Sequence, residues 1–142
     1  MEPSRKLGFK FESLKTALNG FDKFLKLTAD SLDPILADAV RNGAIQKFEY
    51  CSELCWKAMK SFLAEVHGVD AGTPKQVFKE CFLTGLLQEA ELDLALEMVD
   101  DRNWASRMCR EKDFLVIVDR LPRYLQLMMV VVQNAEKVLG AR

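Results

Sequence analysis

The segment LGFKFESLKTALNGFDKFL, residues 7–25, decides the fold class because its apolar side chains follow a helical spacing. Its large apolar residues recur every three or four positions: Leu7, Phe11, Leu14, Leu18, Phe21 and Leu25. This spacing places all six side chains on one face of a helix. A helix with one apolar face must bury that face against other elements of the same kind or against a sheet.

The remainder of the chain also has helical spacing, and no segment alternates as a β-strand would. A second helix is predicted from Asp33-Pro34 to Gly68, and Gly43 leaves open a division into a short and a long helix. The core stripe predicted for this helix consists of Ala44, Phe48, Cys51, Cys55, Met59, Phe62 and Val66.

Three more helices are predicted after residue 72. One begins at Thr73-Pro74 and stops near Gly85, and the next begins near Glu89. The last runs from about Asp113 toward Leu139 and should kink at Pro122. We therefore expect an all-α, up-and-down helical bundle of four to five helices, with residues 1–142 forming a single helical-bundle domain.

Composition excludes several classes of function. The chain has 142 residues, with 20 Lys plus Arg against 21 Asp plus Glu, so it lacks the basic surplus needed to wrap duplex nucleic acid, although a local basic patch remains compatible. The most apolar run, residues 125–132, is far shorter than the roughly 20 residues of a membrane span. No signal-peptide pattern is visible, so we expect a cytoplasmic protein with no membrane association.

The sequence offers no catalytic or metal-binding motif. Cys51 and Cys55 are one helical turn apart and lack the CxxC-like spacing of a zinc site, so the four cysteines are interpreted as reduced thiols. No nucleophile triad, phosphate-binding Gly-rich loop or paired carboxylates can be recognised. We expect no cofactor, no metal and no self-sufficient enzyme.

Two polar residues interrupt the apolar stripe of the predicted fourth helix. Leu92, Leu96 and Val99 are followed at the same spacing by Asn103 and Ser106. Burying a polar side chain without a partner costs about 1–3 kcal/mol, so this position is a candidate binding site. The alternative is that the stripe reaches the surface as the helix leaves the bundle, which would leave both side chains solvated.

The second helix has a matching polar row beside Trp56. Its members, spaced at three or four residues, are Gln46, Glu49, Glu53, Lys57 and Lys60. The alternative interpretation is a solvated face with ion pairs worth about 0.3–0.5 kcal/mol each, and a Trp56 that covers the edge of the core.

The segment IQKFEYCSELCWK, residues 45–57, followed by Lys60, resembles the signature of the nucleotidyltransferase substrate-binding protein family. That family belongs to the HEPN group of helical bundles. Further resemblance lies in residues 73–75, 78–80 and 85–87, and in Asp101-Arg102-Asn103 with Ser106. The resemblance as a whole spans about residues 7–125.

The resemblance implies a small all-helical subunit, typically a homodimer, that pairs with a separately encoded minimal nucleotidyltransferase. The partner would supply the metal-dependent chemistry, and the bundle would hold or present the substrate. Some HEPN relatives are instead ribonucleases of toxin–antitoxin pairs, with an R-x₄-H motif followed by Tyr. This chain has Arg107 in place of the His and Cys109 in place of the Tyr. An arginine cannot act as a general base, which argues against ribonuclease activity.

We therefore expect a non-catalytic substrate-binding subunit with a cleft between the second and fourth helices. The predicted site residues are Gln46, Glu49, Glu53, Trp56 and Lys57 on one wall and Arg102, Asn103, Ser106 and Arg107 on the other. A group of cations near the end of the fourth helix would suit a nucleotide or other phosphate-bearing ligand: Arg102, Arg107, Arg110 and Lys112. The alternative is that nearby acids neutralise these cations: Glu97, Asp100, Asp101 and Glu111. The alternatives are a HEPN-type ribonuclease toxin and a helical interaction module whose polar residues set dimer register.

Overall fold

The computed structural model describes residues 3–27, 33–107 and 111–141, and within these ranges every regular element is a helix. The helices are α1 (Arg5–Leu25), α2 (Pro34–His67), α3 (Pro74–Leu83), α4 (Glu89–Ala105) and α5 (Glu111–Gly140). The all-α bundle predicted from the sequence is confirmed.

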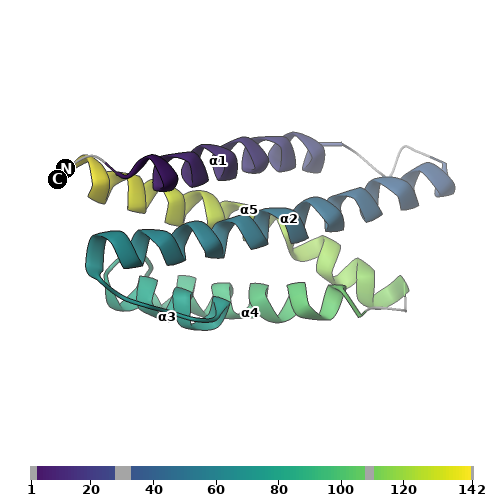
Figure 1. The fold of residues 1–142 in the computed structure, drawn as a ribbon. Coiled ribbons are helices and arrows are strands. Elements are labelled where there is room, and N and C mark those ends of the chain that lie inside the picture. The colour runs from purple at the N-terminus through teal and green to yellow at the C-terminus, as the bar shows by residue number, and fades with distance from the viewer. Residues whose placement is uncertain (1–2, 28–32, 108–110, 142) are drawn as a thin grey trace.

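Helix α2 is the central element of the bundle. It contacts each of the other four helices. In Figure 1, α1 lies along one side of α2, and α3 and α4 lie along the opposite side. Helix α5 packs against α1, α2 and α4. Figure 1 also shows that α5 changes direction along its length, and Pro122 lies inside this helix. Hollows lined by residues of α2 lie on both of these sides, toward α1 and toward α4.

Capping side chains fix where the helices begin. The Ser4 hydroxyl accepts a hydrogen bond from the backbone N–H of Leu7 (3.1 Å), and one oxygen of Asp33 accepts from the first turn of α2. Thr73 caps α3 in the same way. The end of α2 is set by Gly68, whose φ of 65° is left-handed and favours glycine.

Gly43 does not divide α2, which is continuous from Pro34 to His67. The lack of a side chain at this position instead lets α1 approach closely. A Cβ atom on Gly43 would lie 2.6 Å from Cζ of Phe24. The same ring lies 5.4 Å from the Lys47 ammonium. Gly43 therefore serves the packing of α1 on α2.

The core consists largely of the residues that the periodicity selects. In α1, all members of the predicted stripe are buried except Leu25, which is half-buried. In α2, all are buried except Val66. The ring of Phe48 stacks on that of Tyr124 at a centroid distance of 5.4 Å, which joins α2 to α5. None of the described helices is long and apolar enough to cross a lipid bilayer.

Candidate functional site

Glu53 is the centre of a polar cluster on α2. The indole N–H of Trp56 donates to Oε2 of Glu53 (3.0 Å), and the Lys57 ammonium lies 3.0 Å from Oε1. Arg102 of α4 approaches the same carboxylate, with Nη2 3.5 Å from Oε2. The hydrogen bond from Trp56, together with Lys57 and Arg102, lowers the pKa of Glu53 below its usual value. The site therefore holds a stably ionised carboxylate with three donors around it.

A small hollow lies beside this cluster, between α2 and α4. Its volume is about 90 Å³, and it is lined by Ser52, Glu53, Trp56, Pro74, Val99, Arg102 and Asn103. This space can hold a few water molecules or one small polar group. Within the described part of the chain, Nε of Arg102 is buried and has no hydrogen-bond partner. A buried donor normally has a partner, so the Arg102 side chain, which lines the hollow, carries an unsatisfied hydrogen-bonding group.

The structure brings together part of the predicted site. Four of its members line the hollow: Glu53, Trp56, Arg102 and Asn103. Lys57 is exposed but pairs with Glu53. The remaining members lie outside the lining of the hollow: Gln46, Glu49, Ser106 and Arg107. Gln46, Ser106 and Arg107 are exposed, and Glu49 is half-buried.

The prediction that Asn103 and Ser106 occupy core positions is wrong. Both side chains are exposed, and the Ser106 hydroxyl donates to the Asn103 carbonyl (2.8 Å) at the end of α4. The face of α4 that is buried instead consists of Ala95, Met98, Val99 and Asp101. The stripe chosen from the sequence is shifted by about one residue relative to this buried face. Apolar residues at steps of three or four can be found on both faces of α4, so the spacing alone does not show which face is buried. The alternative of a solvated helix end is the correct one.

The residue that sequence reasoning missed is Asp101. It is only 4% exposed, and Nη1 of Arg120 lies 3.0 and 2.9 Å from its two carboxylate oxygens. The hydroxyl of Tyr124 contacts Asp101 and lies 2.8 Å from Oε1 of Glu97. Burial, followed by these hydrogen bonds, raises the pKa of Tyr124, so its proton stays in place. No signal in the sequence pointed to Asp101, because the spacing alone does not select the phase of α4 in which Met98 and Asp101 are buried.

Within the basic patch predicted near the end of α4, an ion pair to another helix is seen for Arg102, and two of the acids expected to neutralise the patch pair elsewhere. Arg102 pairs with Glu53, as described above, and Asp100 pairs with Lys75 of α3 at 2.7 Å. Asp101 pairs with Arg120. These acids are thus engaged with other elements rather than with their sequence neighbours. Cys109 and Arg110 lie outside the described residues.

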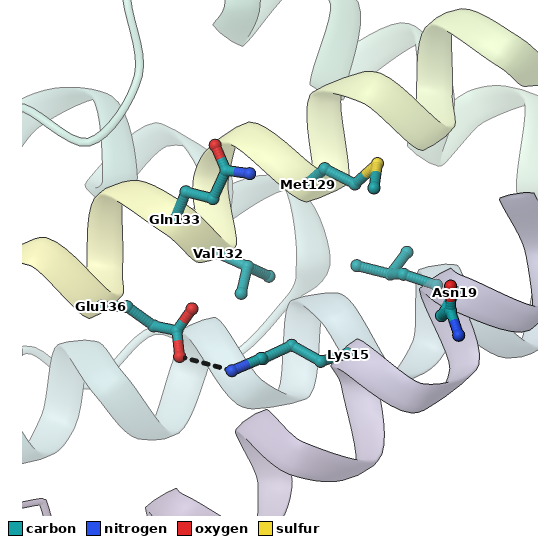
Figure 2. A pocket seen from close by; sticks show the side chains of 7 residues that line it. Lys15, Asn19, Met129, Val132, Gln133 and Glu136 are labelled. Atoms are coloured by element: carbon teal, nitrogen blue, oxygen red, sulfur yellow. Dashed lines mark hydrogen bonds and ion pairs between the residues drawn. The ribbon is translucent and has the colours of Figure 1, made fainter.

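A second cavity, between α1 and α5, is unlike the hollow beside Glu53. Its volume is about 220 Å³, and its lining is Lys15, Leu18, Asn19, Met129, Val132, Gln133 and Glu136. Figure 2 shows Lys15 and Glu136 pointing toward each other at its edge, at 3.0 Å. Because this ion pair is already formed and most of the surface that lines the cavity belongs to apolar atoms, the cavity offers little for polar recognition.

Metal-binding groups are also absent from the residues that the structure describes. No group of three or more His, Cys, Asp or Glu side chains is placed to hold a metal ion there. Cys51, Cys55 and Cys81 are buried free thiols.

Comparison with known proteins identifies the family. The sequence model of the family described as "Nucleotidyltransferase substrate binding protein like" matches residues 9–137. The chain belongs to this family. The family signature on α2 supplies Ser52, Glu53 and Trp56 to the hollow, and the segment 101–103 on α4 supplies Arg102 and Asn103. Two stretches with family-like sequence, about fifty residues apart, thus meet at one place.

Two solved structures resemble this member of the family. A protein of Thermus thermophilus is 34% identical, with a TM-score of 0.77, and the match covers 86% of this chain and 98% of that one. HI0074 of Haemophilus influenzae, whose structure "reveals the fold of a substrate binding domain of a nucleotidyltransferase", is 22% identical with a TM-score of 0.65. That match covers 92% of this chain and 96% of the other and shows a shared fold. No curated protein matches the chain.

Proposed function

We propose that this protein is a non-catalytic, homodimeric substrate-binding subunit that pairs with a separately encoded minimal nucleotidyltransferase. The family to which the chain belongs supports the substrate-binding role. The observation that carries the proposal is Arg102, which lines the hollow beside Glu53 and whose buried Nε lacks a hydrogen-bond partner among the described residues. A buried donor left without a partner costs about 1–3 kcal/mol, and a bound ligand would recover that cost.

The charges at the site favour binding over catalysis. Glu53 is held ionised by Trp56, Lys57 and Arg102, so it suits a charged anchor and not a proton donor. Arg107 cannot accept a proton near neutral pH. The ligand group would be small and polar, such as one phosphate or amide, because the hollow has a volume of only about 90 Å³.

The first experiment tests the pairing. The protein is co-expressed with a minimal nucleotidyltransferase from the same genome, and the two are purified through a tag on one partner only. We expect a stable complex with a dissociation constant in the micromolar range or tighter, and sedimentation should give a dimer for this subunit alone. No association at micromolar concentration would overturn the proposed function.

The second experiment tests the site. Label transfer from α-³²P-ATP to the small-molecule fraction of a cell extract is measured with the purified complex. Arg102→Gln should lower this transfer by about tenfold, which corresponds to the loss of one charge-assisted hydrogen bond, and should leave the complex intact. Arg123→Gln is the matched control because Arg123 is exposed and forms no ion pair among the described residues. Equal loss in both variants would argue against a role for the hollow.

A further inference from the structure

Four lysines gather where α1 meets the C-terminal half of α2, and we call them the lysine cluster: Lys6, Lys10, Lys57 and Lys60. The Lys10 ammonium donates to the Ser61 hydroxyl at 2.6 Å, which ties α1 to α2. Lys6 lies one turn before Lys10 on α1. Partial burial, followed by the positive charges of the other three lysines, lowers the pKa of Lys10. The four charges are therefore close enough to repel one another.

Counter-charges do not balance the lysine cluster. Lys57 pairs with Glu53 (3.0 Å), and Lys60 pairs with Asp70 (3.4 Å). Lys6 and Lys10 form no ion pair with any of the residues that the structure describes. Two uncompensated positive charges held near two others cost free energy in the isolated protein, and a bound anion would reverse that cost.

Space for an anion lies next to Lys6. A hollow of about 390 Å³ is lined by Ser4, Lys6, Leu7, Ser61, Ala64 and Glu65. The acidic group here, Glu65, accepts a hydrogen bond from the Ser4 backbone N–H at 3.0 Å. Lys6 and Ser61 both line this space, and ammonium and hydroxyl groups are donors that bind phosphate oxygens.

Exposed aromatic rings lie on the same α1–α2 groove. Phe9 is 72% exposed and Tyr50 is 62% exposed, and both line a hollow of about 360 Å³ together with Glu12, Ser13, Thr16 and Ala17. Phe9 directly precedes Lys10 in α1. Exposed aromatic side chains next to cations are surfaces on which planar bases stack, whereas a simple phosphate would not use them.

We propose that the α1–α2 face binds a nucleotide phosphate, with its phosphate groups on Lys6, Lys10 and Lys57 and its base against Phe9 or Tyr50. The ligand is either a free nucleotide or part of a single strand, since both present the same chemistry. Four lysines match a few phosphates, and the net charge of −1 gives no surplus for a duplex. The inference concerns the α1–α2 face, which is distinct from the hollow beside Glu53 and is linked to it through the ion pair of Lys57 with Glu53. It rests on the proposed function only in taking this ligand to be a substrate.

The test uses the purified full chain without the nucleotidyltransferase. ATP, tripolyphosphate and a single-stranded deoxyadenosine oligonucleotide are titrated separately by calorimetry at low salt. The double variant Lys6→Gln/Lys10→Gln should weaken ATP binding by at least about tenfold. The control Lys23→Gln/Lys79→Gln removes the same charge from exposed positions on α1 and α3 and should change the affinity by less than about twofold.

The three ligands separate the two sources. A free nucleotide is the ligand if ATP binds more tightly than the oligonucleotide, and a strand is the ligand if the order is reversed. Phe9→Ala should weaken ATP but leave tripolyphosphate unchanged, because only ATP has a base to stack. The inference is overturned if none of the three binds at millimolar concentration, or if the control variant loses as much affinity as the cluster variant.

Failure of this inference is distinguishable from failure of the proposed function. Co-purification with the nucleotidyltransferase does not depend on the ligand titrations, so either result can be negative alone. Misfolding is checked by the melting temperature. The cluster variant should melt no lower than the wild type, since removing like charges relieves repulsion. If the melting temperature of the double variant falls strongly, the titrations are repeated with Lys6→Gln alone. This single variant should lose about half of the binding free energy expected to be lost in the double variant.

Discussion

Nη1 of Arg120 lies 2.9 Å from Oδ2 of Asp101, and this ion pair joins α5 to α4 at the position directly before Arg102. Asp101 is thereby fixed toward α5, and Arg102 extends toward Glu53 of α2. Two neighbouring residues of α4 thus have different roles: the Asp101–Arg120 pair holds α4 against α5, and the Arg102–Glu53 pair borders the candidate site. We expect Asp101 to position Arg102 without contacting a ligand.

Replacing Asp101 with Asn should destabilise the protein by about 2 kcal/mol. The substitution leaves Arg120 and Tyr124 facing a neutral group, and breaking a buried pair is costly. We expect less than the value for a fully buried pair because Arg120 is 36% exposed. Urea denaturation measures the change. Asp119→Asn, at an exposed position on α5, is the control and should be within about 0.5 kcal/mol of the wild type.

The Glu53 carboxylate should make stability depend on acidic pH. The pKa of Glu53 in the folded protein is lowered, so its contribution is fully present above the unfolded value of about 4.3. It is then lost as the pH falls through the folded pKa. The stability difference between the wild type and Glu53→Gln should therefore shrink when urea denaturation is repeated from pH 7 down to about pH 3. A difference that stays constant over this range would contradict the ion pairs seen around Glu53.

Lys10 should show the opposite dependence at alkaline pH. The pKa of Lys10 in the folded protein is lowered, so its charge is destabilising below that pKa and is relieved as the pH rises toward the unfolded value of about 10.4. We expect the stability of the wild type relative to Lys10→Gln to increase between pH 7 and about pH 10.5. The same relative gain should appear when salt is added at pH 7, because screening weakens repulsion. Absence of both trends would show that repulsion among the four lysines does not destabilise the folded protein.

Two glycines in helices should respond differently to alanine. A Cβ at Gly20 meets no atom within 4 Å, so Gly20→Ala should stabilise the protein by about 1 kcal/mol through helix propensity. A Cβ at Gly43 would lie 2.6 Å from the Phe24 ring, which must move and give up its contact with Lys47. Gly43→Ala should therefore gain nothing or be destabilising in thermal unfolding. Equal gains at both sites would mean that Phe24 moves aside without cost.

Incubation with single-stranded RNA should give no cleavage products. Arg107 stands where the ribonuclease motif has a histidine, and a guanidinium cannot serve as general base. Gel analysis of a labelled RNA after prolonged incubation measures this. Cleavage that disappears in Arg102→Ala would reinstate the ribonuclease alternative.

Local patterns predicted the fold well, because helical spacing and caps are encoded within a few residues. The stripe of α1, the extent of α2 and the start at Thr73 all follow from neighbours in the sequence. The site was predicted less completely. The meeting of Glu53 with Arg102 agrees with the predicted cleft, but the burial of Asp101 depends on Arg120 and Tyr124, about twenty residues further along.

The lysine cluster was missed for a related reason. Lys6 and Lys10 are separated from Lys57 by about fifty residues, and each looks like an ordinary exposed lysine in its own helix. Only the packing of α1 along α2 shows that they repel one another. The sequence also did not show which face of α4 is buried, since apolar residues at three- and four-residue steps occur on both candidate faces.

The sulfur atoms in the core provide a means of observing transient opening of this bundle. Burial raises the pKa of Cys51 and of Cys81 to about 12, so both stay protonated and unreactive while α2 and α3 remain packed. After Cys109→Ser, each maleimide captured at neutral pH would record one excursion in which these helices part. Mass spectrometry could follow the labelling over hours and would measure the rate of native-state opening without the introduction of a new cysteine.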